Sequence, residues 1–238
     1  EKDIANVNAD LAVYKANGNK FPASYKLLGF PISTFSSTPL RAGDLYFKDL
    51  NGDNIITDAD KSIIGNAYPK FSYGFALNLN YKIVDLSASF NGTEGNTVID
   101  GQDYYIRNME GSGNLYTIVK QRYRNEANPG NGKEYRASRG GSQSNSTRLS
   151  DYYLQDGSFF RCTNISLNVN LSSLSIFKKM KIGGITWSAS VDNAFTITEY
   201  FGYNPEVDFN NGSNLTPGVD YGKYPLVRSF NTGFKVQF

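Results

Sequence analysis

Histidine is absent from the 238 residues, and there is a single cysteine, Cys162. Histidine is the commonest general base and the commonest nitrogen ligand for zinc, copper and iron, so its absence excludes Ser-His-Asp, Cys-His and histidine-zinc chemistry within this chain. One cysteine also excludes an intrachain disulfide and a cysteine-based metal cluster. With no histidine to activate it, Cys162 is interpreted as a small strand residue and not as a nucleophile.

The sequence also lacks long apolar runs and an excess of charge. No apolar run approaches the roughly 18 residues of a transmembrane helix, so a membrane protein with this sequence would have to be a barrel. The 24 basic and 22 acidic residues give a net charge of +2 and form no basic run, which argues against a nucleic-acid partner. The chain begins Glu1-Lys2-Asp3 without a basic-then-apolar leader, so we expect a removed leader or a piece of a longer protein.

Tyrosine (17) and phenylalanine (16) are abundant, a composition that favours strands and turns. Five segments alternate apolar and polar residues with period two, which predicts amphipathic antiparallel strands over 71–81, 84–91, 159–171, 185–197 and 226–238. In the third, the apolar face holds Phe159, Thr163 and Ile165, is interrupted by Arg161, and has Phe160 and Cys162 opposite it. In the fourth, Asn193 is the exception on the apolar face.

Soluble sandwiches also show this alternation, but three features favour a membrane barrel. Four of the five segments are about 11–13 residues long, against roughly 5–6 in soluble sheets and about 9–11 for a membrane crossing. The polar face is mostly Ser, Asn, Gly and Thr, as in a barrel lumen. The first hairpin closes through Lys82-Ile83, whereas 92–158 and 198–225 are long loops, the asymmetry of outer-membrane barrels. Aromatic residues near the strand ends would suit interfacial girdles: Phe71, Tyr81, Phe159, Phe160, Tyr200, Phe201 and Phe238.

The remaining segments are less regular. Residues 3–16 fit a short helix or a polar strand, 29–36 and 43–49 fit further strands, and 115–124 has helix-like spacing inside the long loop. Residues 129–146 are rich in Gly, Asn and Ser and are expected to be irregular.

One segment has the spacing of a calcium-binding loop. Asp49, Asn51 and Asp53 occupy positions 1, 3 and 5 of an EF-hand pattern, with Asp60 at position 12 and the backbone carbonyl of Ile55 at position 7. Position 6 is Asn54 in place of glycine, and the closing residue is the shorter Asp. The alternative is a turn rich in Asp, Asn and Gly that is held by its own side-chain hydrogen bonds. The sequence thus predicts a structural Ca²⁺ ion or such a turn.

Other candidate binding groups lie in the loops. Aromatic and arginine side chains of the long loop would suit a ligand or a partner protein, or would simply be solvated: Arg107, Arg122, Arg124, Arg136, Arg139, Arg148, Tyr104, Tyr105, Tyr116, Tyr123 and Tyr135. Glu206 and Asp208 could form the carboxylate pair of a glycosidase, but nothing in the sequence places two carboxylates across a cleft.

Four motifs, in order, resemble the SusC-like (SusC/RagA) TonB-dependent transporters. They are DLYFKDLNGDNIITDADKSIIGNAYPKFSY (44–73), LSDYYLQDGSFFRCTNI (149–165), DNAFTITEYFGYNPEV (192–207) and VDYGKYPLVRSFNTGFKVQF (219–238). The resemblance covers residues 43–238, and residues 1–42 match only loosely.

This resemblance implies an all-β fold in which the chain forms the C-terminal antiparallel strands of a barrel of about 22 strands with long extracellular loops. It implies a multi-pass protein of a Gram-negative outer membrane with a periplasmic C-terminus. It also implies partners: the remaining barrel and plug, TonB through an N-terminal part absent here, a SusD-like surface lipoprotein, the lipid bilayer, and oligosaccharide or peptide cargo. Phe238 would be the terminal aromatic that assembly machinery recognises.

The function expected is therefore nutrient import without catalysis. Two alternatives stay open: a soluble secreted calcium-binding β-domain of lectin-like type, and a glycoside hydrolase fragment. Detergent dependence would separate the first from a barrel, and turnover that depends on an acidic pair would identify the second.

Overall fold

The computed structural model describes residues 2–33, 40–138, 145, 148–179, 183–208 and 217–237. The chain divides into two compact units, each made of two stretches. We call Glu1–Ile64 with Gln102–Tyr153 the loop unit, and Gly65–Gly101 with Leu154–Phe238 the sheet unit. Residues 43–64, which the sequence grouped with the barrel segment, belong to the loop unit.

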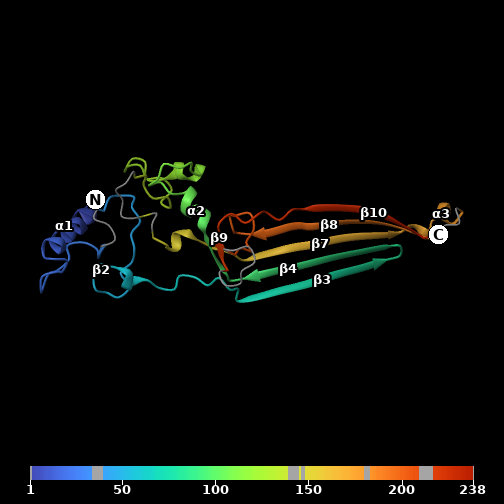
Figure 1. Cartoon of the computed structure of the whole chain (residues 1–238), viewed down its shortest axis with the longest axis horizontal. Helices are drawn as coiled ribbons and strands as arrows, with labels where there is room; N and C mark the ends of the chain where they lie inside the picture. The colour runs from blue at the N-terminus through green and yellow to red at the C-terminus, as the bar shows by residue number, and fades with distance from the viewer. Residues whose placement is uncertain are drawn as a thin grey trace. The chain divides into compact units, whose positions relative to one another are not determined.

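Five long antiparallel strands form the sheet unit (Figure 1). In the sheet order β10-β8-β7-β4-β3, they are Ser229–Gln237, Gly184–Thr198, Phe159–Asn170, Val84–Glu94 and Phe71–Tyr81. A strand thus lies in each of the five ranges expected from the alternation. β4 runs three residues further than expected, and β10 begins at Ser229 instead of 226.

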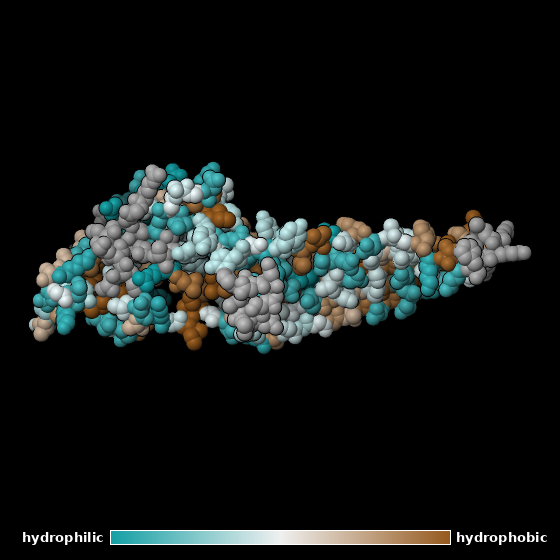
Figure 2. All heavy atoms as spheres, in the orientation of Figure 1, coloured by the Kyte–Doolittle hydropathy of each residue, from teal (hydrophilic) through white to brown (hydrophobic). Residues whose placement is uncertain are grey.

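The strand register gives the sheet two chemically different faces. Across all five strands, one row pairs Leu77, Ala88, Ile165, Val191 and Phe230. The next row, on the opposite face, pairs Asn78, Ser87, Ser166, Ser190 and Asn231. We call these the apolar face and the polar face. In Figure 2, both hydrophobic and hydrophilic side chains reach the surface along the strands.

A β-bulge at Thr163 places residues 159–162 on the faces opposite to those predicted from the sequence. Ser89 of β4 pairs with Asn164, but the next residue, Phe90, pairs with Cys162, so Thr163 is the extra residue. Its hydroxyl donates a hydrogen bond to the Ser89 carbonyl at 3.1 Å. An extra residue reverses the alternation beyond it. Phe160 and Cys162 therefore lie on the apolar face, and the prediction that placed Phe159 there was wrong.

Arg161 lies on the polar face for the same reason, so it does not interrupt the apolar face as the sequence suggested. The neighbouring strand adapts to the bulge at Asn193, whose φ of 51° is left-handed. Asn is among the few residues that tolerate this conformation. The two exceptions to the sequence pattern thus lie at one irregularity.

A second, small sheet forms within what the sequence presented only as long loops. It has the order β6-β5-β9, with β6 Leu154–Asp156, β5 Thr97–Asp100 and β9 Val219–Asp220. Val98, Tyr200 and Val207 form a buried cluster in the same unit. Segments from three distant parts of the sequence are thereby joined at one end of the long strands (Figure 1).

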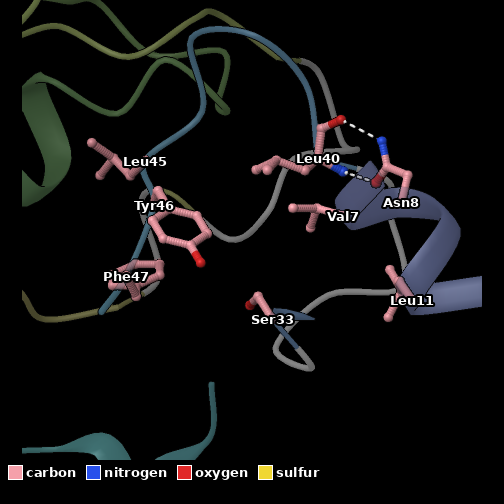
Figure 3. Close-up of a pocket in the computed structure, with 8 residues that line it drawn as sticks. All are labelled: Val7, Asn8, Leu11, Ser33, Leu40, Leu45, Tyr46 and Phe47. Atoms are coloured by element: carbon pink, nitrogen blue, oxygen red, sulfur yellow. Dashed lines mark hydrogen bonds between the residues drawn. The ribbon is translucent and has the colours of Figure 1, made fainter. Parts of the chain in front are cut away.

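The loop unit begins with α1, Lys2–Ala16, so residues 3–16 are a helix and not a polar strand. Val7 and Leu11 pack with Ile32 in a buried cluster. Asn8 donates a hydrogen bond to the Leu40 carbonyl at 2.9 Å and accepts one from its amide at 2.8 Å (Figure 3). The cavity beside this contact has a volume of about 10 Å³, which is room for about one water molecule at most.

The other elements are short. The parallel pair β1, Ile32–Ser33, and β2, Ile55–Ile56, contains only part of the strand expected over 29–36, and residues 34–39 lie outside the described residues. The expected strand over 43–49 does not form. The helical segments are α2 Gly101–Ile106, α3 Ser175–Lys179, and the 3-10 helices Asp58–Asp60, Thr117–Gln121, Asp151–Tyr153 and Leu171–Ser173.

Of the helices in the described ranges, none is long and apolar enough to span a membrane.

Candidate functional site

The predicted calcium loop is held by its own hydrogen bonds. Asp49 accepts backbone N–H bonds from Gly52 and Asn54 at 2.7 and 2.8 Å. Asn51 and Asp53 each accept one from the residue two positions on, at 2.8 Å. Asn54 takes a left-handed φ of 68°, as its turn position requires. This is the side-chain-held turn that the sequence offered as the alternative to an ion.

Asp60 closes the loop from its other end. Its carboxylate accepts N–H bonds from Leu50 at 2.9 Å and from Thr57 at 2.7 Å, and it completes the capping box of the 3-10 helix that follows Thr57. These backbone donors, Thr57 first, lower the pKa of Asp60. Asp60 therefore works as a structural cap whatever else it binds.

An ion would have to share these oxygens with the backbone. Within the described residues, no group of three or more His, Cys, Asp or Glu side chains lies close enough to hold a metal. Ile55, whose carbonyl was the fifth expected ligand, lies in β2. The loop thus forms without a set of side chains already arranged around a metal site, and calcium binding stays a prediction. Phe238, the expected assembly signal, lies outside the described residues.

Several loop arginines that the sequence offered for ligand binding are used internally. Arg107 pairs with Asp103 at 2.5 Å and with Glu134 at 2.6 Å, and its guanidinium lies 4.7 Å from the centre of the Tyr152 ring. Tyr152 donates its hydroxyl to Glu134 at 2.8 Å. Burial raises the pKa of Asp103 and of Tyr152. One cation thus faces two buried carboxylates, and the site organises the loop unit.

Arg136 and Arg148 are likewise paired within the loop unit. Arg136 contacts Asp44 at 2.6 Å, and Arg148 contacts Asp58 at 3.1 Å. Tyr135 is buried in a cluster with Met109 and Val119. Arg139 lies outside the described residues. The arginines and tyrosines of the long loop therefore include structural side chains as well as exposed ones.

On the polar face of the long sheet, several side chains hydrogen-bond to side chains of the neighbouring strand. Asp192 accepts bonds from the amides of Asn164 on β7 and Asn231 on β10, at 2.7 and 3.0 Å. Ser87 and Ser166 share a hydrogen bond of 2.7 Å across β4 and β7. Such a surface offers amide and hydroxyl groups to water or to a polar solute, with few charges to trap either.

The apolar face carries an aromatic band near one end of the strands. The Phe90 ring stacks on Phe75 at a centroid distance of 4.9 Å and on Phe160 at 5.5 Å. Tyr73 and Phe195 lie next to Phe160, at 6.5 and 6.2 Å. The bulge brings Phe160 into this band, which period-two counting from the sequence does not show.

Polar groups on the apolar face bond to one another. The Trp187 indole donates to the Thr232 hydroxyl at 3.0 Å, and that hydroxyl donates to the Ser188 carbonyl at 3.1 Å. Because these polar groups are paired, the rest of the apolar face presents aromatic rings and aliphatic side chains. Phe230 and Phe234 are 74% and 68% exposed on it.

Arg161 fixes a loop to the polar face. It is only 4% exposed, and its guanidinium bonds Thr196 and Asn204, each at 3.1 Å, and makes an ion pair with Glu206. Asp208 pairs instead with Lys223 at 2.7 Å. Glu206 and Asp208 thus each have a cation of their own and are not arranged as a glycosidase pair across a cleft.

Comparison with known proteins shows extensive sequence similarity to outer-membrane receptors. The chain is 30% identical over 233 residues to TonB-dependent receptor P39 of Formosa agariphila, a match that covers 97% of this chain and 22% of the receptor. It is 29% identical to TonB-dependent receptor SusC of Bacteroides thetaiotaomicron, over 81% of this chain and 17% of SusC. The chain therefore spans about a fifth of the length of these relatives. No family model matches.

Solved structures show the same fold. A structure of the RagAB peptide importer in the closed-closed state aligns with a TM-score of 0.60 over 77% of this chain and 19% of that chain, at 22% identity. A second RagAB structure aligns with a TM-score of 0.56 at 23% identity. At this identity the likeness concerns the fold alone.

Proposed function

We propose, from the homology of this chain to the SusC-like TonB-dependent receptors, that it forms the C-terminal strands of an outer-membrane barrel of about 22 strands. The whole protein would import nutrients across the outer membrane of a Gram-negative bacterium. TonB-dependent receptors are transporters and not enzymes. Glu206 and Asp208, each paired with its own cation, give no support for a catalytic function.

The single observation that carries this proposal is the two-faced sheet. Five strands of 9–15 residues present an apolar face and a polar face in register, and about 9–11 residues cross a membrane. On the edge strand β3, Phe75, Leu77 and Leu79 are about half exposed. Lipid would cover these side chains, and the Ser/Asn surface behind them would line a water-filled lumen.

The proposed orientation follows from counting strands, because each antiparallel strand crosses the membrane in the direction opposite to the strand before it. If the C-terminus is periplasmic, β10 begins outside, and the long segments before β7 and β10 lie on the extracellular side. The aromatic band around Phe160 then marks the outer interface, where such rings gather. The connection between β7 and β8 would be periplasmic. Phe238 would be the terminal aromatic of the last strand, read during assembly.

Cargo and partners follow from the same family. A SusD-like surface lipoprotein would cover the extracellular mouth, and TonB would act through the N-terminal part of the whole protein. Oligosaccharide is the proposed cargo, with peptide as the other class. We also propose that Ca²⁺, if bound by Asp49, Asn51, Asp53, Ile55 and Asp60, is structural and lies on the extracellular side.

Cysteine accessibility in the intact receptor tests the proposal. In a Cys162→Ser background, single cysteines replace Leu77 and Leu79 on the apolar face and Asn78 and Asn80 on the polar face. A water-soluble maleimide should label positions 78 and 80, and quenching by brominated lipid should affect only fluorophores at 77 and 79. The reason is that adjacent residues of one strand would face different solvents.

Arg148→Cys, in the loop unit, is a matched control for reagent access. It should be labelled by the maleimide and unaffected by brominated lipid. Equal labelling of all four strand positions, with no lipid quenching at any, would overturn the barrel.

A further inference from the structure

We propose that an open depression in the loop unit binds the acidic groups of an oligosaccharide. The inference rests on the proposed import function and specifies its substrate class. The depression has a volume of about 900 Å³ and is lined by residues from three segments: Arg41 and Ala42, 122–127, and Arg136 with Ala137. This is within the size range of ligand pockets, roughly 300–1,000 Å³.

The lining is cationic. It contains four arginines, Arg41, Arg122, Arg124 and Arg136, and one carboxylate, Glu126. The Arg136 charge is offset by Asp44, which contacts it at 2.6 Å. Three guanidinium groups therefore face a single acidic side chain within the lining. Guanidinium groups bind carboxylate, sulfate and phosphate oxygens through paired N–H donors, so oxyanions are the chemistry that this lining would recognise.

Backbone contacts hold the three segments together without a ligand. The Arg136 amide donates to the Gly43 carbonyl at 2.8 Å, and the Tyr123 amide donates to the Glu134 carbonyl at 3.2 Å. Gly43 has a φ of 85°, and a Cβ there would lie 2.5 Å from the Tyr123 ring. The first segment thus approaches the second as closely as only glycine permits. A site that is formed in advance loses less entropy on binding.

The turn that carries two of the charged groups is also fixed. Asn125 and Asn128 exchange backbone hydrogen bonds of 3.4 and 3.0 Å, which close the turn around Glu126. Arg122 donates to the Val119 carbonyl at 3.3 Å, and Arg124 donates to the Lys120 carbonyl at 3.5 Å. Each of these guanidinium groups keeps further N–H donors, because an arginine has five.

The polar groups beside the arginines favour a saccharide over other polyanions. The Glu126 carboxylate accepts hydrogen bonds, and sugar hydroxyl groups donate them. Ala42, Ala127 and Ala137 leave space between the charged side chains. An acidic sugar has both the oxyanion for the arginines and hydroxyl groups for the Glu126 carboxylate. The source of the oxyanion, a uronate carboxylate or a sulfate ester, is left for the experiment to distinguish.

Binding to the intact receptor in detergent tests the inference with four probes of similar length. They are an oligogalacturonate, a sulfated galactan oligomer, a neutral maltooligosaccharide, and an acidic peptide matched in charge to the oligogalacturonate. We expect one of the two acidic saccharides to bind most tightly, with an affinity that falls as salt rises. Arg122→Gln with Arg124→Gln should weaken it by about tenfold or more.

The matched control is Arg148→Gln, which removes the same charge from an arginine that does not line the depression. It should leave acidic binding unchanged. Acidic probes that bind no better than the neutral oligomer, or a double variant that binds them as wild type, would overturn the inference. Tightest binding of the peptide would overturn the saccharide assignment.

The cysteine accessibility pattern on β3 is measured separately. If the receptor shows that labelling pattern but does not prefer the acidic probes, only this inference is refuted. If the labelling pattern itself is absent, the proposed function is refuted.

Discussion

Arg161 shows how one side chain links a long strand to a loop 45 residues away. Its three groups of partners, Thr196, Asn204 and Glu206, come from β8 and the segment that follows it. From the sequence alone, Arg161 was an interruption of an apolar face. Its role could not be predicted, because it depends on the bulge two residues later and on contacts with a segment whose position the alternation does not determine.

Replacing Arg161 by Met should loosen the loop that contains Asn204 and Glu206. The variant leaves the Glu206 carboxylate without its cation, but Glu206 is about half exposed, so water compensates part of the loss. We expect the free energy of local opening, measured by amide hydrogen exchange over 199–208, to fall by roughly 1–2 kcal/mol. A double-mutant cycle with Glu206→Gln should show coupling. Independent effects of the two changes would contradict a shared ion pair.

The buried group around Arg107 predicts a dependence on pH. Burial raises the pKa of Asp103, so the folded loop unit holds a proton at pH values where the unfolded chain, with a carboxyl pKa of about 3.9, has lost it. Its stability should therefore fall as pH rises through the interval between the two values. Asp103→Asn should remove this dependence and preserve or increase stability at pH 7, as followed by proteolysis of the loop unit.

Glu134→Gln is the contrasting variant at the same site. Glu134 accepts from both Arg107 and Tyr152, so the change weakens two contacts at a buried position. We expect a destabilisation of roughly 2 kcal/mol. The opposite order of the two variants at pH 7 would contradict the charge balance described here.

At the scale of elements, strands that are defined by a local residue pattern could be predicted from the sequence, whereas strands that are defined by long-range pairing could not. The five long strands could be predicted because each carries its own alternation over eight or more residues. The small sheet could not, because β5, β6 and β9 are only two to four residues long and pair across distances such as Ile99 to Val219. The turn around Asp49 was predictable because its hydrogen bonds join residues a few positions apart.

Inserting one alanine between Cys162 and Thr163 should prevent correct assembly of the sheet. Asn164 and Cys162 already pair with the consecutive residues Ser89 and Phe90, so a second extra residue beside Thr163 would shift 159–162 by one position. The shift would place Arg161 on the apolar face and Phe160 on the polar face. An unpaired arginine facing lipid is costly in a barrel. We expect loss of the assembled receptor in the outer membrane, measured by heat-modifiable electrophoresis of membrane fractions.

Two controls accompany this insertion. Thr163→Ser keeps the bulge and the hydroxyl that bonds Ser89, so it should assemble normally. Insertion of one alanine after Gly113, an exposed loop residue where an added Cβ would meet no atom within 4 Å, should also be tolerated. Normal assembly of the variant with the insertion beside Thr163 would show that the register is not fixed by the bulge.

The Asp49–Asp60 loop leads to a prediction about metal binding. If the loop binds Ca²⁺, its affinity should be that of extracellular modules, with a Kd of about 10⁻⁴–10⁻³ M, because the oxygens already accept backbone hydrogen bonds. Calorimetry of the intact receptor should detect this binding, and Asp49→Ala with Asp53→Ala should abolish it. Asp58→Ala, an exposed carboxylate outside the expected ligand set, is the control. No binding at about 10 mM Ca²⁺ would leave the hydrogen-bonded turn as the whole explanation.

At the scale of the whole molecule, the long sheet has two edges and two faces to satisfy. β3 and β10 each pair with a neighbour on one side only within the sheet. Unpaired strand edges invite association with other chains, and an outward apolar face is stable only against lipid or another apolar layer. These features connect the residue pattern to the barrel: the neighbouring strands and the bilayer would supply what the sheet lacks.

Expressed alone, this chain should therefore not behave as a soluble monomer. The exposed side chains of β3 and β10 on the apolar face, including Phe75, Leu79, Phe230 and Phe234, should cause aggregation in buffer, whereas detergent micelles should cover them. We expect size-exclusion chromatography without detergent to give material in the void volume. The intact receptor in the same detergent is the positive control, with a single peak. A sharp monomer peak in buffer alone, with cooperative unfolding, would contradict the membrane barrel and favour the soluble calcium-binding domain instead.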